Sequence, residues 1–545
     1  MKDLFRKYDT FVLLAFLAIT YCIFIGVHKD FGISWDEAIQ REHGLVTLDY
    51  INEACNDCIS SENISDTLLQ EYKWKYYGTI FQVISQFAEE ILGYGETAER
   101  FYLRHRIQLA FFIIALFCFY TFSKLRFKDP FLAFCGLLIL LSTPRLLGHQ
   151  FFNPKDAVFL SGYVIAISSL IHLIYNHKNW KYYLLHAFCT GLVVDIRILG
   201  LFLIPLTILG LLLANKGLKD IKNLLIKSGT YLLLSCFFMI LMWPLLWSNP
   251  IENLMGAFKD MSAFNWGGEV LLHGKYLMGN NLPPDYIPQW IMVTSPILAL
   301  ALILFGILSY LSIRILKTRF SFDKERSISS PNWRQETSDL ICFLAAIGPI
   351  VLVILLKSTL YDGWRQIHFV YPMFIYFILF LIYQFGRSQF KEIRWMGSGL
   401  LVLLVLIQFK SIWTWHPLQH VYFNGLAKKP WVENYELDYW GSGFKYAYEE
   451  YAQTLAPGEE VGIFSNAYPG WESYLALSDL NKEKLSYEWE EEKREVYVSN
   501  YRYRKELEPF LKKSPPFNNE VFVIKRKGEV IYGFYKIERK ENISE

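Results

Sequence analysis

The sequence lacks an excess of charge of either sign. Its 545 residues contain 54 Lys and Arg against 52 Asp and Glu, which gives a formal net charge of +2. Proteins that bind nucleic acid usually carry a basic excess, so nothing here indicates a nucleic-acid partner. Charged residues make up only 19% of the chain, whereas hydrophobic residues make up 53% and aromatic residues 17%. This composition is too apolar for an ordinary soluble enzyme and predicts a polytopic membrane protein.

Cysteines outside the apolar segments are also scarce. The chain has eight Cys, and only Cys55 and Cys58 lie in a predicted outside loop. A local disulfide or two free thiols fits this pair better than a metal site, which needs further ligands. The first apolar segment lacks a small-residue cleavage site at Gly26-Val27-His28, so we interpret it as a retained anchor.

Long apolar segments recur along the chain. A helix of about 18 or more apolar residues can span the bilayer core, because it satisfies its own backbone hydrogen bonds there. We predict about eleven spans, near residues 10–28, 107–123, 130–147, 157–176, 182–196, 199–215, 228–247, 290–313, 339–357, 367–385 and 396–413. Lys and Arg gather before the first span and after the second, fourth, sixth, eighth and tenth spans, as in cytoplasmic loops. The N-terminus is therefore predicted inside, and loops 29–106, 144–156, 248–289 and 358–366 outside.

Two further regions are predicted outside the membrane. Aromatic and apolar residues recur at helical spacing over 76–87, which indicates a helix that either lies along the interface or packs on the membrane domain. The composition after about residue 445 is that of a soluble domain, with a β-hairpin pattern over 520–535. We predict a transmembrane domain over 1–413, with the outside loop 29–106, and a small extracytoplasmic α/β domain over 414–545.

Asp36-Glu37 follows the first span within a few residues. Two adjacent carboxylates can bind a cation, take a proton from an acceptor, or simply remain solvated at a helix end. An isolated pair is usually ordinary solvated charge. Its functional interpretation therefore depends on other polar residues that the topology places on the same membrane face.

Several ionisable residues share that face, at span ends where unused charge is costly. They are Arg145, His149, Lys155 and Asp156 between the third and fourth spans, Arg197 after the fifth, Asp362, Arg365 and His368 between the ninth and tenth, and Tyr422 after the last. The simpler alternatives are that Arg145 and Lys155 only reach lipid head groups, and that Asp195 forms a local ion pair with Arg197. Arginine suits a phosphate because its planar fork donates hydrogen bonds in pairs.

The acidic pair after the first span, followed later by an Arg and then an Asp that opens a span, resembles the membrane glycosyltransferases of the C fold. Over roughly the first 200 residues it most resembles family 39, the protein O-mannosyltransferases and bacterial lipid A aminoarabinose transferases. The resemblance implies that Asp36 activates the acceptor, that Glu37 contacts the acceptor or orients the site, and that Asp156 is the second acid, with Arg145 upstream of it. It also implies a polyprenyl-phosphate sugar as donor. No segment is long enough for the β-trefoil domain of the eukaryotic members, and the soluble mass lies at the C-terminus, as in many bacterial members.

We therefore predict an integral-membrane glycosyltransferase that moves a hexosyl or pentosyl group from a polyprenyl-phosphate sugar to a protein, lipid or glycan acceptor. Its site would face the extracytoplasmic side of a bacterial inner membrane. The candidates for donor-phosphate binding are Arg145, Lys155, Arg197 and Arg365, and those for the acceptor or a lid are His149, Asp362, His368 and Tyr422. Hard oxygen ligands at Asp36 and Asp156 would suit Mg²⁺ or Mn²⁺, but the pattern does not require a metal.

Two other functions stay open at this point. A transporter or flippase of a lipid-linked substrate would place ionisable residues near the middle of spans, whereas here nearly all of them lie at the outer ends. A ligase that moves a whole polyprenyl-linked glycan needs the same outside phosphate site. The sequence does not separate this ligase from a transferase of single sugars.

Overall fold

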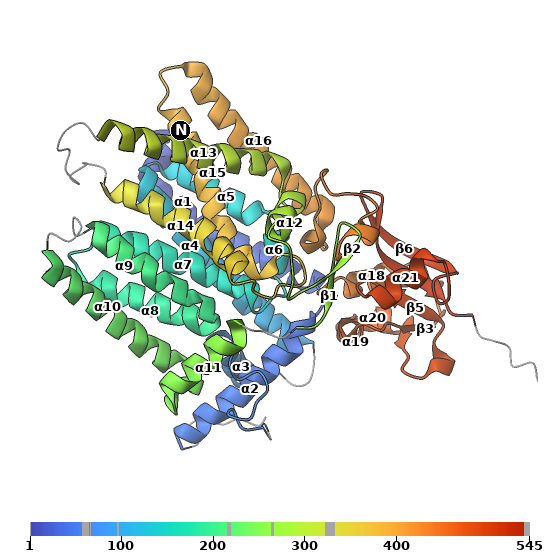
Figure 1. Cartoon of the computed structure of the whole chain (residues 1–545). Helices are drawn as coiled ribbons and strands as arrows, with labels where there is room; N and C mark the ends of the chain where they lie inside the picture. Colours follow the sequence, from blue (N-terminus) through green and yellow to red (C-terminus); the bar gives the residue numbers. More distant parts are fainter. Residues whose placement is uncertain are drawn as a thin grey trace, which may run out of the picture.

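The chain forms a bundle of long helices with a small sheet region at one end (Figure 1). The computed structural model describes residues 2–56, 65, 67–94, 98–214, 220–262, 266–321 and 333–538. Eight of the described helices are long and apolar enough to cross a membrane. They are α1 (Lys2–Val27), α4 (Glu99–Phe127), α7 (Asp156–Tyr175), α10 (Ile221–Met242), α13 (Ile297–Ser321), α14 (Trp333–Leu355), α15 (Tyr371–Gly386) with its preceding turn η5 (Arg365–Val370), and α16 (Lys391–Trp415).

Each of the eleven predicted apolar segments overlaps a helix. Three of them form shorter helices, α5 (Pro130–Ser142), α8 (Trp180–Ile196) and α9 (Leu203–Ala214), and the other eight coincide with the eight described helices that are long and apolar enough to cross a membrane. The predicted 130–147 span is divided, because α5 ends at Ser142 and α6 (Pro144–His149) begins with a proline. The helices and the composition together make the chain an integral, multi-pass membrane protein.

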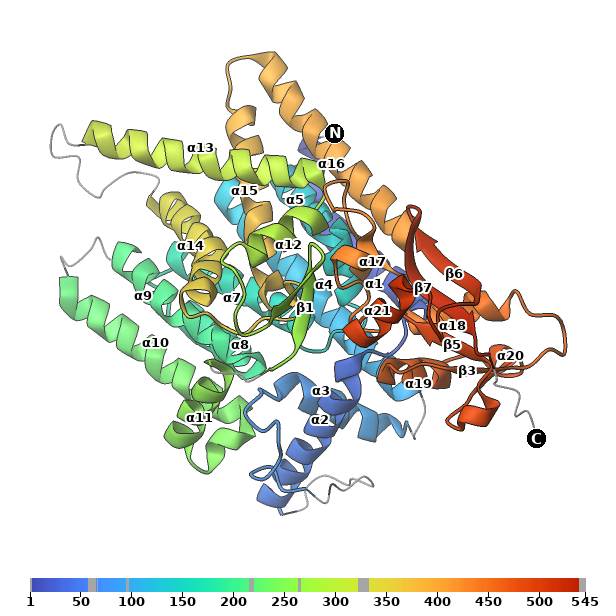
Figure 2. The same cartoon turned by 45° about the vertical axis from the view of Figure 1, so that its right-hand side comes forward.

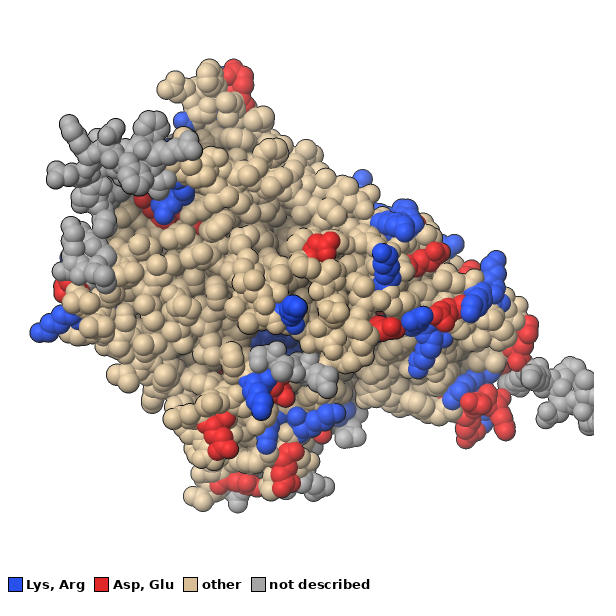
Figure 3. Space-filling view, in the orientation of Figure 1, with Lys and Arg blue, Asp and Glu red and all other residues tan. Residues whose placement is uncertain are grey.

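The core of the bundle surrounds α7 and α15. Both are buried along most of their length, and α7 packs against α4 and α8 while α15 packs against α13 and α16. In contrast, the outer face over the long helices carries few Lys, Arg, Asp or Glu (Figure 3). Charged residues gather instead on the sheet region and around α2 (Trp35–Ala54) and α11 (Pro250–Ser262). A broad face with few charges is what a bilayer requires of a spanning bundle.

Two short helices turn their apolar residues outward. α3 (Ile80–Leu92) buries Gln82, Gln86 and Glu89 against α2 and α4. Its exposed apolar residues are Ile84, Phe87, Ile91 and Leu92, and those of α11 are Ile251, Met255 and Phe258. This pattern suits an interfacial helix. The helix predicted over 76–87 is thus present from Ile80, and it packs through its polar face.

The C-terminal region contains a five-stranded sheet in the order β4-β3-β5-β7-β6. The strands are β3 (Val461–Phe464), β4 (Leu485–Tyr487), β5 (Val496–Ser499), β6 (Glu520–Arg526) and β7 (Glu529–Lys536). β3 pairs in parallel with β4 and β5, whereas β7 is antiparallel to β5 and β6. The helices of this region are α18 (Phe444–Ala452), α19 (Tyr468–Leu475), α20 (Asp479–Lys482) and α21 (Arg504–Leu511). The predicted hairpin over 520–535 is confirmed, and the small α/β fold with it.

The segment between α11 and α13 forms a short hairpin and a helix. Strands β1 (Glu269–Leu272) and β2 (Lys275–Met278) pair antiparallel and are followed by α12 (Tyr286–Thr294). Figure 2 shows this hairpin on the side of the bundle that faces the sheet region. A bridge between Leu272 and Tyr435 joins it to the chain that follows α16, near α17 (Trp431–Asn434). Elsewhere, Cys55 is disulfide-bonded, whereas its predicted partner Cys58 lies outside the described residues.

Candidate active site

The start of α2 is attached to the chain that precedes the sheet. The backbone N–H of Gly32 donates to Ser442 O at 2.9 Å, and that of Trp35 donates to Trp440 O at 3.2 Å. A Cβ atom at position 32 would lie 2.6 Å from the Ser442 carbonyl oxygen, so this close approach requires glycine. The attachment places the first turn of α2, with Asp36, against residues more than four hundred positions later.

A cavity of about 270 Å³ lies at this junction. Its lining comes from six segments: the first turns of α2, the loop before α3, the start of α7, Trp266 before β1, the 361–365 hairpin and the C-terminal region. The residues that matter below are Trp35, Asp36, Gln40, Tyr77, Lys155, Tyr361, Asp362, Arg365, Tyr439, Trp440 and Arg502. Figure 3 shows a hollow in this part of the surface with basic atoms recessed in it.

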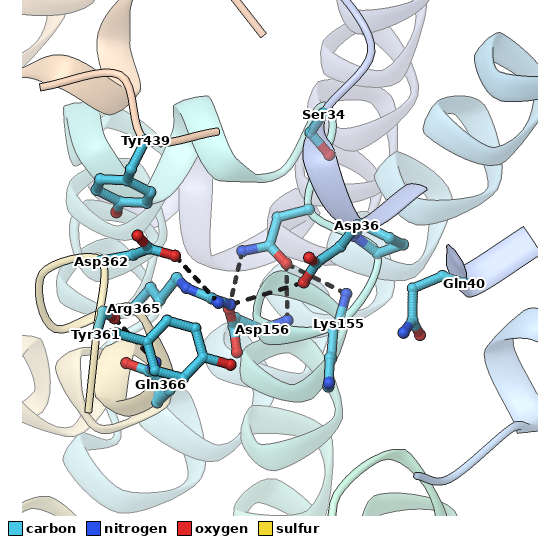
Figure 4. Close-up of polar contacts among 12 residues, drawn as sticks. Ser34, Asp36, Gln40, Lys155, Asp156, Tyr361, Asp362, Arg365, Gln366 and Tyr439 are labelled. Atoms are coloured by element: carbon cyan, nitrogen blue, oxygen red, sulfur yellow. Dashed lines mark hydrogen bonds and ion pairs between the residues drawn. The ribbon is translucent and has the colours of Figure 1, made fainter. Parts of the chain in front are cut away.

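Arg365 lies at the centre of the charged groups (Figure 4). Its Nη1 is 2.7 Å from Asp156 Oδ2 and 3.9 Å from Asp36 Oδ2, and its Nη2 is 3.3 Å from Asp362 Oδ2. The side chain is only 3% exposed. A buried guanidinium shared among three carboxylates keeps its charge and holds them around one point.

Two aromatic rings hold the same guanidinium between them. Its central carbon is 4.7 Å from the ring centroid of Tyr361 and 4.6 Å from that of Trp440. Such cation–π contacts fix the plane of the fork as well as its position. Arg365 is therefore a preorganised cation at the cavity wall.

Asp156 is the most fully compensated of the three acids. It opens α7, and its Oδ1 is 2.6 Å from Arg197 Nη2 while its Oδ2 accepts from Arg365. The Asn153 side chain also donates to Oδ2 at 3.2 Å and accepts from the Asp156 backbone N–H at 2.9 Å. With two guanidinium groups on one buried carboxylate, Asp156 serves to hold the two arginines together.

Lys155 precedes this acid and faces the cavity. Its Nζ lies 3.1 Å from the centroid of the Tyr77 ring, and the residue is buried. Burial, and then the nearby charge of Arg197, lowers the pKa of Lys155 to about 7. The ammonium charge therefore depends on pH near neutrality and would be favoured by an anion in the cavity.

Asp36 is the open acid of the group. Its side chain is 27% exposed, against 1% for Asp156. Among the described residues its carboxylate has one charged partner, Arg365 at 3.9 Å. A carboxylate that faces a cavity without short hydrogen bonds can accept a proton from a bound molecule.

Glu37 is differently placed and does not line the cavity. Its Oε2 accepts from the Ser34 backbone N–H at 2.6 Å, which completes a capping box at the start of α2. Its Oε1 is 2.6 Å from His105 Nε2. Both oxygens are thus occupied, so of the two roles predicted for Glu37 these contacts favour the orienting one, in which it holds the helix that carries Asp36.

The geometry does not fit a divalent cation held by Asp36 and Asp156. Both carboxylates face Nη1 of the same arginine, so a positive group already occupies the place between them. No group of three or more His, Cys, Asp or Glu that could hold a metal ion occurs among the described residues. The chemistry considered below therefore uses the side chains of the chain itself.

Asp195 has a structural role at the end of α8. Its two carboxylate oxygens accept from the backbone N–H groups of Thr79 at 3.0 Å and Ile80 at 2.7 Å, at the start of α3. Arg197 pairs with Asp156 instead. The local ion pair between Asp195 and Arg197, one of two interpretations of the sequence, therefore does not form. Arg197 belongs instead to the charged cluster around Asp156.

Four predicted site residues lie together but outside the lining of the cavity. Arg145 donates from Nη2 to Tyr422 O at 3.2 Å, and the rings of His149 and His368 are 4.7 Å apart. His149 Nε2 is 3.4 Å from the hydroxyl of Tyr439, whose ring lines the cavity. Burial, and then His368, lowers the pKa of His149 well below its ordinary value. This cluster therefore lies behind Tyr439.

Sequence reasoning missed several lining residues. Arg502, from the loop after β5, places Nη2 2.8 Å from Asp362 Oδ1 and also donates to the Tyr439 carbonyl. Gln40 lies one helical turn after Asp36, and its Oε1 accepts from Gln82 Nε2 at 3.0 Å. The sequence could have indicated Gln40, because residues four positions apart on a helix lie on the same face. No local pattern pointed to Arg502.

No known protein-family model matches the chain, and no curated protein matches it significantly. Solved structures that resemble it include the oligosaccharyltransferase of Archaeoglobus fulgidus in its apo form, with 12% identity and a TM-score of 0.46 over 91% of this chain and 70% of that one. The same archaeal enzyme, AglB, in complex with an inhibitory peptide and a dolichol-phosphate has 13% identity and a TM-score of 0.45, over 90% and 70%. ArnT from Cupriavidus metallidurans bound to undecaprenyl phosphate has 9% identity and a TM-score of 0.44, over 96% and 97%. All three TM-scores are below 0.5.

Proposed function

We propose that the chain is an integral-membrane glycosyltransferase that uses a polyprenyl-phosphate sugar as donor. The observation that carries the proposal is the pairing of one open acid, Asp36, with a fixed cation, Arg365, in a cavity at the end of a membrane bundle. Transfer from a sugar phosphate needs these two groups, a base for the acceptor and positive charge for the leaving phosphate.

The charge around the cavity favours an anion. Lys155, Arg197, Arg365 and Arg502 supply four positive groups, and Asp36, Asp156 and Asp362 supply three negative ones, which leaves an excess of one when Lys155 is protonated. Burial in a cavity lined by aromatic rings strengthens the attraction, because the local dielectric constant is below that of water. A phosphodiester with one negative charge would balance this excess.

The reaction follows from this placement. The Asp36 carboxylate takes the proton from an acceptor hydroxyl or amine, and the acceptor atom forms a bond to the anomeric carbon. The bond from that carbon to the phosphate oxygen breaks, and its electron pair leaves on the phosphate. Arg365 and Lys155 stabilise the new phosphate charge, Asp156 holds Arg365 and Arg197 in place, and direct displacement inverts the anomeric configuration.

The finer assignments belong to the same proposal. The sugar is a hexosyl or pentosyl group, the acceptor is a protein, lipid or glycan, and the likeness to family 39 seen in the sequence supports this class. The Lys and Arg asymmetry of the loops supports a site on the extracytoplasmic face of a bacterial inner membrane. The division into residues 1–413 and 414–545 is part of the same assignment, with membrane lipids and no nucleic acid as further partners.

The test uses the purified full-length chain in lipid nanodiscs. Defined polyprenyl-phosphate sugars and nucleotide sugars are offered as donors to a panel of protein, lipid and glycan acceptors, and products are identified by mass spectrometry. We expect products only from lipid-linked donors. We also expect strongly reduced product from Asp36→Asn and normal yield from Asp30→Asn, a half-exposed acid that pairs with His416 outside the cavity.

Four outcomes would contradict the proposal. Products from a nucleotide sugar would point to a cytoplasmic type of donor, and movement of intact donor between leaflets without product would indicate a flippase. Transfer of an entire glycan from a polyprenyl diphosphate would indicate a ligase. A membrane-impermeant reagent that fails to label a cysteine introduced at Asn518 in intact cells would place the site on the other face.

A further inference from the structure

Arg502 connects the C-terminal sheet region to the cavity, and the reaction described above assigns it no step. It lies in a short loop after β5 whose residues are held in place. Asn500 Nδ2 donates to Asp438 O at 2.8 Å, and the hydroxyls of Tyr501 and Tyr535 are 2.6 Å apart. Tyr501 adopts φ 55°, a conformation that is unfavourable for a bulky residue and persists only where its surroundings impose it. The loop therefore fixes the direction of residue 502.

The guanidinium of Arg502 joins three segments at the cavity wall. Nη2 is 2.8 Å from Asp362 Oδ1, and Nη1 donates to the backbone carbonyl of Tyr439. Its central carbon is 5.6 Å from the ring centroid of Trp35, the residue next to Asp36. The side chain is 15% exposed, so most of it is committed to these contacts.

Asp362 divides its carboxylate between two arginines. Oδ1 faces Arg502, and Oδ2 lies 3.3 Å from Arg365 Nη2. The side chain is 6% exposed, and these two arginines are its charged partners among the described residues. A second buried acid, Glu436, lies close enough that Asp362 contributes to raising its pKa, after burial itself. Without Arg502, Asp362 would have only Arg365 as partner beside another carboxyl group.

The direction of the Arg365 fork depends on both of its carboxylate partners. Nη1 meets Asp156 at 2.7 Å while Nη2 meets Asp362 at 3.3 Å. Asp156 is held by Arg197 and Asn153, so its position is fixed from the membrane side. In the described part of the chain, the charged partner that holds Asp362 from the other side is Arg502. An Asp362 side chain that moves would let Arg365 turn about its bond to Asp156.

We propose that Arg502 is a positioning residue, which acts through Asp362 to hold the Arg365 guanidinium where a lipid-linked phosphate binds. This inference rests on the proposed function. It makes the C-terminal sheet region a part of the donor site, because that region sets the affinity for the phosphate without contacting the lipid. The effect should fall on donor binding and not on the proton transfer at Asp36.

The first test measures binding of undecaprenyl phosphate to the full-length chain in nanodiscs, together with KM for the donor and kcat at saturating donor. We expect Arg502→Ala to raise the dissociation constant and the donor KM by about ten- to a hundredfold, the effect of losing one charged hydrogen bond, with kcat nearly unchanged. Arg502→Lys should recover part of the loss, because lysine supplies the charge without the fork.

The matched control is Arg504→Ala. Arg504 lies two residues later, is 54% exposed and pairs with Glu508 at 2.7 Å, away from the cavity. It should bind undecaprenyl phosphate as the unaltered chain does. A loss of donor affinity in Arg504→Ala equal to that in Arg502→Ala would mean that the effect is a general one on surface charge, and would overturn the inference.

The second test is a double-mutant cycle with Asp362→Asn. If Arg502 acts through Asp362, then Arg502→Ala in the Asp362→Asn background should cost little further affinity. The full loss in that background would show that Arg502 contacts the ligand itself, and would overturn a positioning role. Should Arg502→Ala fail to fold, as judged by its melting temperature, Arg502→Lys and Asp362→Asn supply the same cycle.

The outcomes for the two proposals are separable. If the unaltered chain binds undecaprenyl phosphate and every Arg502 variant binds it equally well, then the inference is wrong and the proposed function stays intact. An unaltered chain that neither binds this lipid nor transfers sugar from it overturns both.

Discussion

The buried arginine–aspartate contacts of Arg126 and of Arg365 lie in the same bundle, and they are built differently. On α4, Arg126 meets Asp339 of α14 through two parallel contacts, Nε to Oδ1 at 2.6 Å and Nη2 to Oδ2 at 2.8 Å, and the hydroxyl of Tyr376 donates to the same carboxylate. Arg365 instead spreads its fork over three carboxylates, one of which is open to a cavity. Both arginines are nearly inaccessible to solvent.

The comparison shows that a buried ion pair alone does not identify a functional site. The Arg126–Asp339 pair satisfies itself, and it joins three helices as a structural contact. Arg365 contacts Asp156 and Asp362 closely, whereas Asp36 lies 3.9 Å from it and faces the cavity. We call the Arg126–Asp339 pair closed, because its groups satisfy each other, and the Arg365 cluster open, because one of its acids faces a cavity. A closed pair is expected to stabilise the fold, whereas an open one can take part in a reaction. Substitutions at the two sites test this difference.

The largest expected effect is at the open acid. Asp36→Asn removes the base and should lower the rate of transfer by about 10²- to 10⁴-fold, the usual contribution of a general base. The melting temperature should change little, because Asp36 makes no short contact. Initial rates at saturating donor and acceptor, with Glu37→Gln for comparison, measure this. A variant that keeps near-normal turnover would remove Asp36 from the mechanism.

The closed pair should respond in the opposite way. Arg126→Ala leaves Asp339 buried without its cation, which is expected to cost about 3–5 kcal/mol of stability. The melting temperature in nanodiscs should fall sharply, whereas the donor KM of the protein that remains folded should not change. If the donor KM rose as it does for Arg365 variants, then the pair would be part of the substrate site and the contrast would fail.

Lysine substitutions sharpen the comparison at equal charge. Arg365→Lys keeps one positive charge but cannot hold Asp156 and Asp362 together, so the donor KM should rise by about ten- to a hundredfold. Arg126→Lys loses one of two parallel contacts and should affect the melting temperature only. Donor saturation curves and thermal unfolding of both variants decide the matter. Equal donor KM values for both variants and the unaltered chain would argue against a phosphate at Arg365.

The smallest effect concerns pH. The pKa of Lys155 is lowered to about 7 by burial and then by Arg197, so its charge is present below pH 7 and is lost above it. Its charged fraction falls by about tenfold between pH 6 and pH 8, and the affinity for a donor phosphodiester should weaken over that interval. Lys155→Arg should remove the dependence, because arginine stays charged. Dissociation constants at pH 6, 7 and 8 test this, and an unaltered profile in Lys155→Arg would exclude Lys155 as its origin.

The sequence predicted the helices well and the site in part. Apolar length located all eleven segments, but it could not show that Pro144 begins a separate short helix. Chemistry and topology brought Asp36, Lys155, Asp156, Arg197 and Arg365 to one face, and the structure places them within one cluster. Their grouping was predictable because charge at a span end is costly unless it is paired or used.

The sequence specified some details of the site and not others. Ser34-x-x-Glu37 is a capping-box pattern, so the structural role of Glu37 was readable from the sequence. Four predicted site residues do not line the cavity although they lie at the outer ends of spans: Arg145, His149, His368 and Tyr422. A position at a span end does not specify on which side of Tyr439 a residue lies. Arg502 was not predictable, because its contact with Asp362 joins residues 140 positions apart and Arg502 lies in a loop of the C-terminal sheet region.

Each aspartate of the charged cluster pairs with an arginine that lies much later in the chain, so the order of synthesis affects when the cluster can form. Asp156 leaves the ribosome 209 residues before Arg365, and Asp362 leaves it 140 residues before Arg502. At about 5–20 residues per second, Asp156 waits roughly ten seconds or more for Arg365, and Asp362 waits roughly seven seconds or more for Arg502. The other arginine partner of each acid, Arg197 for Asp156 and Arg365 for Asp362, is made sooner. During that time each carboxylate has only one of its two arginines, and burial of a carboxylate that is only partly paired is costly. A chain that ends before residue 502 lacks Arg502 and Tyr503, so only a nearly complete translation product carries the whole lining of the cavity.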